Sequence, residues 1–158
     1  MSDAATEYFR LEQADVAVDA SFPPKFVNIE EIPFVNLAEG IRFKPVFGKS
    51  ILFNYVYFEP HAVAPTHQHP EEQFGTILEG EYEFEIAGVA KMMRPGDVYV
   101  VPPNVPHSAR TYDKGCLAID IFSPPRSGFR EMLDRVEWAG REGGPIDESN
   151  PDGGANPS

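Results

Sequence analysis

His67 and His69 are the first residues whose types and spacing could do chemistry. Residues two apart in a β-strand point to the same face, so this pair can offer two imidazoles to one ion. The pair alone is equally compatible with two surface histidines in a proline-rich turn. His107 supplies a third imidazole after a second proline-rich run, so three of the four histidines fit one pattern. The pattern indicates a metal site.

Asp120 is a second candidate, because it is the one charged residue in the apolar run 117–122. In a strand it shares one face with Ala118 and Phe122. A carboxylate among apolar neighbours costs free energy unless it is hydrogen-bonded, paired or open to a cavity. We interpret this face as the interior of a barrel beside the metal, where Asp120 would act as a general acid or base.

Arg126 follows Asp120 closely and is preceded by two prolines that restrict the backbone. A guanidinium held in this way can grip a carboxylate through two parallel hydrogen bonds. The alternative is an ion pair between Asp120 and Arg126 that only ties down the end of the strand.

The spacing of these residues resembles the cupin superfamily. Its first motif runs Gly, five residues, His-x-His, three or four residues, Glu, six residues, Gly; its second runs Gly, five residues, Pro-x-Gly, two residues, His, three residues, Asn. Over about residues 40–125 the chain matches these motifs at His67, His69, Gln73, Gly80, Gly96, Pro102 and His107. The resemblance implies an all-β, single-domain cupin, a jelly-roll barrel also called a double-stranded β-helix.

Three positions depart from the motifs, namely His61 and Asn104 in place of glycines and Thr111 in place of the closing Asn. Asparagine tolerates a left-handed turn, so we expect Asn104 to keep the bend. For His61 a surface turn and a role at the barrel mouth both stay open.

The resemblance implies one divalent transition metal, bound by His67, His69, Gln73 and His107. Nickel, iron, manganese, cobalt and zinc all suit imidazole and amide ligands. Gln73 stands where the motif has Glu, so all four ligands are neutral. The ion then keeps its full formal charge, which favours Lewis-acid chemistry and an anionic substrate. The alternative is a cupin that has lost its metal, but the three retained histidines argue against it.

The stretches 67–86, 95–107 and 120–126 are similar to pectin-degradation cupins of the KdgF type. This resemblance implies an isomerase that converts 4,5-unsaturated uronates to 5-keto-4-deoxyuronate, with catalytic roles for Asp120, Phe122 and Arg126. Other cupins with a Gln ligand resemble the chain too, including the isomerase of bacilysin synthesis and manganese hydroxynitrile lyases. A metal-dependent dioxygenase and a non-catalytic small-molecule-binding module also stay open.

Short β-rich runs separated by turn residues must position these side chains. The expected strands are Ile41–Val46, Ile51–Glu59, Phe74–Glu79, Glu81–Ile86, Asp97–Val101 and Leu117–Phe122. Only Phe129–Val136 has the apolar spacing of a helix, and we expect it to pack against the barrel.

Length and charge restrict the function further. The 158 residues suit one domain, which we divide into a flexible N-terminal tail (1–20), the barrel (21–138) and a disordered acidic tail (139–158). A net charge of −12 disfavours nucleic-acid binding.

No apolar run approaches the ~18–20 residues of a membrane span, and the N-terminus lacks the order of a secretory signal, so we predict a cytoplasmic protein without membrane contacts. We expect Cys116, the only cysteine, to be a buried hydrophobe. The cupin resemblance implies a homodimer.

Overall fold

The computed structural model describes residues 19–136, which form ten strands and one α-helix. The elements in chain order are η1 (Ile29–Glu31), β1 (Val35–Ala38), β2 (Ile41–Phe47), β3 (Leu52–Phe58), β4 (Val63–His67), β5 (Glu72–Gly80), β6 (Tyr82–Ile86), β7 (Val89–Met93), β8 (Val98–Val101), β9 (His107–Arg110), β10 (Cys116–Ser123) and α2 (Ser127–Asp134).

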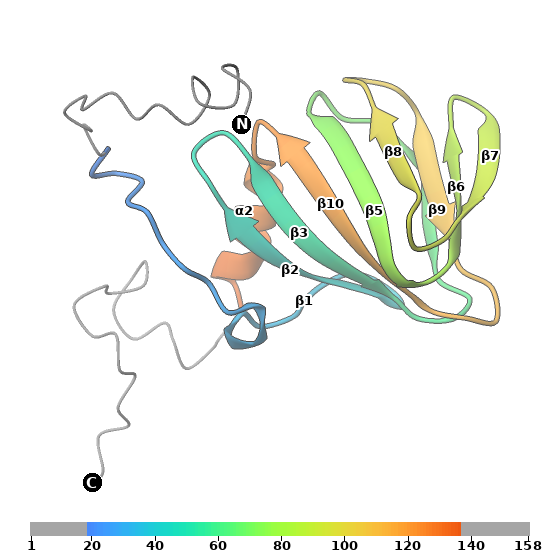
Figure 1. Ribbon diagram of the computed structural model, residues 1–158, viewed down its shortest axis with the longest axis horizontal. Helices are drawn as coiled ribbons and strands as arrows, with labels where there is room; N and C mark the ends of the chain where they lie inside the picture. The colour runs from blue at the N-terminus through green and yellow to red at the C-terminus, as the bar shows by residue number, and fades with distance from the viewer. Residues whose placement is uncertain (1–18, 137–158) are drawn as a thin grey trace, which may run out of the picture.

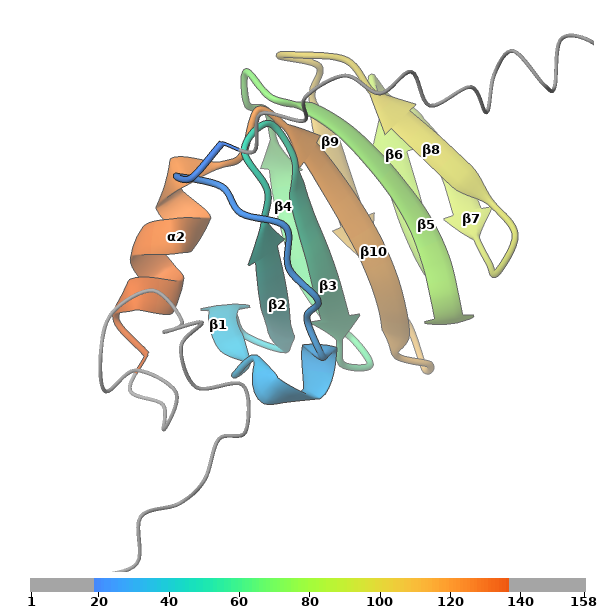
Figure 2. The same ribbon diagram turned by 60° about the vertical axis from the view of Figure 1, so that its left-hand side comes forward.

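The strands form two antiparallel sheets that face each other (Figures 1 and 2). The larger sheet has the order β1-β2-β3-β10-β5-β8, and the smaller has the order β4-β9-β6-β7. Strand β10 pairs with both β3 and β5, which come from earlier parts of the chain. This pairing places Phe122 opposite Gln73, so two candidate site residues meet in one row of the sheet.

Alternation with period two determines which side chains lie between the sheets. In β3 the even-numbered residues from Leu52 to Phe58 are buried, whereas the odd-numbered residues lie half-buried on the outer face. Helix α2 packs near β2 (Figure 2), where the ring of Phe129 stacks on Phe43 with centroids 4.5 Å apart. Cys116 is buried in the core, as expected from its apolar neighbours.

All six predicted strands are confirmed, with ends within two residues of the prediction. Four strands were not predicted, β1, β4, β7 and β9, because they are short and carry few apolar residues in alternation. The predicted helix is confirmed as an element, but it begins at Ser127 and ends at Asp134, two residues earlier than expected at each end.

Most of the two predicted tails, residues 1–18 and 139–158, lies outside the described residues, as do 137 and 138 of the predicted barrel. Asp19 and Ala20, the described end of the N-terminal tail, are exposed. Within 19–136 no helix is both long and apolar enough to cross a membrane.

Candidate metal centre

Three histidines converge at one end of the smaller sheet. His67 is the last residue of β4 and lies opposite His107, the first residue of β9. The argument from strand spacing does not apply to this pair, because β4 ends at His67 and His69 lies in the loop before β5. The rings nevertheless meet, and a possible ligand atom of each lies within 4.8 Å of the others. Imidazole nitrogens bind Zn²⁺ at ~2.1 Å, so two ligands of one ion lie at most ~4 Å apart, close to this spacing.

Backbone carbonyls fix the orientation of each imidazole. The Nδ1 atoms lie 2.7 Å from the oxygen of Pro65 for His67, 3.0 Å from that of Glu71 for His69, and 2.8 Å from that of Val105 for His107. A carbonyl can only accept a hydrogen bond, so Nδ1 carries the proton in all three rings. Each Nε2 therefore keeps a free lone pair, as in metal sites where an outer partner sets the tautomer.

Gln73 in β5 adds an oxygen to this set. Its Oε1 lies 3.1 Å from His69 Nε2, and its Nε2 donates a hydrogen bond of 3.0 Å to Asp120 Oδ1. Two acceptors, the Nε2 lone pair and the amide oxygen, thus face each other, and a cation between them would stabilise the arrangement. His107 Nε2 is also buried without a hydrogen-bond partner among the described residues. The donor set therefore fits a divalent ion.

The protonation of the histidines agrees with this fit. Burial lowers the pKa of His107 to about 4. Burial, with Arg126 acting in the same direction, also lowers the pKa of His69. Both rings are therefore neutral at neutral pH, which is the form that binds a metal.

Asp120 points from β10 into the interior behind Gln73. Its Oδ1 accepts hydrogen bonds from Gln73 and from the hydroxyl of Tyr99, which accepts one of 2.8 Å from Tyr82. Burial raises the pKa of Asp120, and the two bonds that it accepts act in the opposite direction. No ion pair joins Asp120 to Arg126 within 4.0 Å in residues 19–136, so the geometry does not support the alternative in which that pair ties down the strand.

Arg126 lies instead at the entrance, between β10 and α2. Its Nε is 3.9 Å from Glu71 Oε2, and its guanidinium lies 4.8 Å from the ring centroid of Phe129 and 5.4 Å from that of Phe122. Burial lowers the pKa of Arg126, while Glu71 and Asp120 act in the opposite direction, so the guanidinium holds a positive charge against apolar rings. Glu71 was not among the predicted residues.

Two adjacent hollows surround these side chains. The inner cavity, of about 60 Å³, is lined by Gln73, Asp120 and Phe122, and the outer cleft, of about 440 Å³, is lined by His69 and Glu71. Both share the residues Leu37, Ala64, His67, Arg126 and Phe129. Together, the two hollows bring all seven predicted site residues to one place, and the cleft has the size of a small-molecule site.

The departures from the cupin motifs have structural explanations. Asn104 has φ +61°, as expected for a glycine replacement, and its N–H donates a hydrogen bond of 2.8 Å to the carbonyl of His69. Thr111 accepts a hydrogen bond from the Ala62 N–H at 2.9 Å, which fixes the turn after β3. His61 is exposed in that turn and lines neither hollow.

A family model described as "Cupin domain" matches residues 54–122. A solved structure, KdgF from Halomonas sp., is 30% identical, with a TM-score of 0.64, over 67% of this chain and 98% of that one.

The chain is a cupin.

Curated relatives of this cupin include a pectin degradation protein and an isomerase. The pectin degradation protein KdgF of Dickeya dadantii is 28% identical over 102 residues, which are 63% of this chain and 93% of that protein. H2HPP isomerase of Bacillus subtilis is 41% identical over 73 residues, 45% of this chain, but the match spans only 30% of the isomerase. These likenesses support a cupin enzyme of the isomerase or lyase kind without fixing its substrate.

Two buried polar residues near the cupin site were missed from the sequence. Tyr99 reaches Asp120 across β5, and Asn54, 1% exposed, lines the inner cavity. The Asn54 Oδ1 has no hydrogen-bond partner among the described residues. The available signal for Tyr99 was Gly75, since a glycine inside a strand often marks the close approach of another group.

Proposed function

We propose that this cupin is a divalent-metal enzyme for a small carboxylate, and that it opens 4,5-unsaturated uronates and converts them to 5-keto-4-deoxyuronate. The observation that supports this proposal most strongly is the neutral set of three Nε2 atoms and one amide oxygen, with the half-buried side chains of Asp120 and Arg126 lining the same cavity. A divalent ion held by His67, His69, Gln73 and His107 would supply Lewis-acid chemistry at full formal charge.

Arg126 would bind and orient the substrate carboxylate. Glu71 lies against its Nε, which leaves the terminal amino groups of the guanidinium for the fork-like pairing that carboxylates favour. Phe122, whose ring centroid is 5.5 Å from that of His69, would exclude water from the reacting face. The buried amide of Asn54 would take a substrate hydroxyl, because its oxygen otherwise lacks a partner in the described chain.

Asp120 would move the proton. Both hydrogen bonds that it accepts end on Oδ1, so Oδ2 is the oxygen that would face the substrate. In the proposed reaction Oδ2 takes the proton of the hemiacetal hydroxyl as the ring carbon–oxygen bond breaks. It then returns a proton to the enol carbon, which leaves an aldehyde and a ketone. Substrate and product are isomers, so no oxidant is needed.

The decisive experiment mixes the purified protein, loaded in turn with each divalent metal, with unsaturated galacturonate or mannuronate. Loss of the enol-ether absorbance should exceed spontaneous ring opening, and His107→Ala should lose both the metal and the acceleration while the strands persist in circular dichroism. No acceleration with any metal would remove this function.

Two alternative activities have distinct signatures. A metal-dependent dioxygenase would consume oxygen with its substrate, whereas the proposed isomerase consumes none. The similarity to H2HPP isomerase, and to the dimethylsulfoniopropionate lyase DddQ of Ruegeria pomeroyi (39% identical over 78 residues), favours an isomerase or lyase of another small carboxylate as the second candidate. A non-catalytic binding module would bind carboxylates without turnover.

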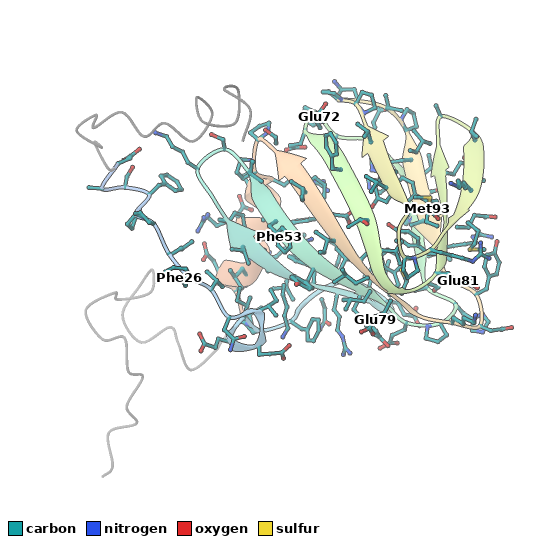
Figure 3. All side chains as sticks on the ribbon, viewed as in Figure 1. Phe26, Phe53, Glu72, Glu79, Glu81 and Met93 are labelled. Atoms are coloured by element: carbon teal, nitrogen blue, oxygen red, sulfur yellow. The ribbon has the colours of Figure 1, made fainter. Side chains whose placement is uncertain are left out.

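The proposed assembly is a homodimer, paired through the outer face of the larger sheet. We define this outer face by Phe53, Tyr55, Phe74, Leu78, Val98, Val100, Leu117, Ile119 and Ile121. None of these side chains is charged, although Phe74, Val98 and Val100 are 42%, 62% and 45% exposed. Figure 3 shows Phe53 on this side, with Glu72 and Glu79 toward the two ends of β5. An apolar centre with a charged rim is the anatomy of a protein interface.

A further inference from the structure

One row of inward positions crosses the larger sheet beside the metal centre. Asp120 in β10 lies opposite Gly75 in β5, and Gly75 lies opposite Tyr99 in β8. A Cβ at position 75 would lie 1.9 Å from Tyr99 Cζ and 2.1 Å from its hydroxyl oxygen. The Tyr99 side chain therefore occupies the space that a side chain at 75 would fill, and this lets its hydroxyl reach Asp120 on the strand beyond.

The hydrogen bonds along this row run in one direction. Tyr82, from the opposite sheet, donates to the Tyr99 hydroxyl at 2.8 Å, and Tyr99 donates to Asp120 Oδ1. Gln73 Nε2 donates to the same Oδ1 at 3.0 Å. Asp120 is thus an acceptor with two donors on one oxygen, one from Gln73 in β5 and one from Tyr99 in β8.

This chain of bonds determines which end of the Gln73 amide faces the histidines. With the amide nitrogen on Asp120, the oxygen points to His69 Nε2 at 3.1 Å. The reversed amide would set its oxygen against Asp120 Oδ1 and turn its NH₂ group, which cannot bind a cation, toward the three imidazoles. When Asp120 is held in place, the Gln73 amide nitrogen is directed toward it and the amide oxygen is available as a metal ligand.

We propose that Tyr99, supported by Tyr82, is a positioning residue that holds Asp120 and, through it, presents the Gln73 oxygen to the metal. The inference rests on the proposed metal-binding function and extends it to two tyrosines that are not among the proposed ligands or catalytic residues. The alternative is a structural role, in which the two tyrosine hydroxyls only provide hydrogen bonds for each other and for the half-buried carboxylate of Asp120 and contribute to stability alone.

A double-mutant cycle on Co²⁺ affinity distinguishes the positioning role of Tyr99 from a purely structural role. Tyr99→Phe keeps the ring, which stacks on Phe84 with centroids 3.9 Å apart, and removes only the donor to Asp120. Loss of a group that orients a ligand weakens metal binding ~10–100-fold, so we expect an effect near the lower end, ~10-fold, in competition with a chelator. In a Gln73→Ala background the same substitution should change the Co²⁺ affinity by less than about twofold, because its target is gone.

Two further variants complete the test. Tyr82→Phe removes the donor to Tyr99 but leaves both bonds to Asp120, so it should weaken Co²⁺ binding less than Tyr99→Phe does. Thr111→Val removes a buried hydroxyl at the far end of β9 and should lower the melting temperature without changing the affinity. The visible absorption of bound Co²⁺ should change in Tyr99→Phe and stay unchanged in Thr111→Val.

Equal losses of affinity for Tyr99→Phe with and without Gln73 would overturn the positioning role, as would an unchanged affinity in the single variant. A wild-type protein that binds no Co²⁺ or other divalent metal would instead overturn the proposed metal function, and this inference with it. The two failures are therefore distinguishable without any measurement of turnover.

Discussion

Gln73 lies between two neighbours that make opposite demands on it. Asp120 Oδ1, 3.0 Å from the amide nitrogen, needs a donor, and the site formed by the histidine Nε2 atoms needs an acceptor. An amide supplies both from one group, whereas an ionised glutamate supplies only acceptors. The amide at this position is therefore matched to the carboxylate behind it, and a glutamate would set two carboxylates in contact.

Gln73→Glu should still bind a divalent ion, since a carboxylate is a good ligand. It should turn over an anionic substrate ~10–100-fold more slowly, because the added charge weakens the Lewis acid and opposes Asp120. Metal content after dialysis and kcat measure the two effects. Gln68→Glu, at an exposed position between His67 and His69, is the matched control for added charge. Unchanged turnover would mean that the neutral ligand is incidental.

Asp120→Asn tests proton transfer separately from binding. The amide keeps an oxygen for the donors Gln73 and Tyr99 but cannot carry a proton, so kcat should fall ~10²–10⁴-fold with little change in KM. Asp113→Asn removes an exposed carboxylate and should leave kcat unchanged. A lower melting temperature for Asp120→Asn with an unaltered rate would make the carboxylate structural, and the uronate proposal would lose its main support beyond the metal ligands.

Arg126→Ala should mainly weaken substrate binding. Loss of a charge-assisted pair is worth ~1.5–3 kcal/mol, so KM should rise ~10–100-fold. Arg126→Lys should restore binding only in part, because a point charge cannot reproduce the fork. The control is Arg130→Ala, which removes an exposed arginine of α2 that lies 4.1 Å from the ring of Phe47. Equal KM values for the two alanine variants would contradict the assigned role.

At the scale of elements, the alternation of apolar and polar residues in a strand was a better guide to side-chain orientation than the two-residue spacing of the histidines. The period-two pattern of β10 correctly gave Asp120 an inward face, because that rule depends only on local geometry. The same rule does not extend to His69, because β4 ends two residues before it and a loop brings its ring to the other two histidines. Tyr99 and Asn54 escaped prediction because their roles depend on which strands pair and in what register. Long-range pairing of this kind leaves almost no trace in the sequence.

Gly75→Ala tests the contact between β5 and β8. The new methyl group would overlap the ring of Tyr99, which must move within a packed interior, at a typical cost of ~1–3 kcal/mol. We therefore expect a lower melting temperature and altered near-ultraviolet circular dichroism. Gly128→Ala, in α2, meets nothing within 4 Å and should be neutral or stabilising. An unchanged melting temperature for Gly75→Ala would contradict the close approach of Tyr99.

At the scale of the whole molecule, the outer face defined above is too apolar for a side that meets only water. Its rows run across four strands, for example Phe53, Ile121, Phe74 and Val100. The four strands that carry this face, each taking up ~4.8 Å of width and at most ~25 Å long, give a flat area of up to ~500 Å² before side-chain relief is counted. Stable interfaces bury ~800 Å² of accessible surface per partner, so a second copy of the same sheet has the appropriate size.

Sedimentation of the wild-type protein should therefore give a dimer, and a charge placed on the outer face should dissociate it. Ile119→Glu, in the middle of the face, and Val98→Glu, in β8, would each bury an unpaired carboxylate twice in a twofold interface, so both should be monomeric at micromolar concentration with unchanged far-ultraviolet circular dichroism. Val89→Glu is the matched control, since Val89 is 74% exposed on the smaller sheet and its substitution should leave the dimer intact. If the wild-type protein is a monomer, or if both outer-face variants remain dimeric, this face does not join two copies. The apolar rows would then have to contact a different partner.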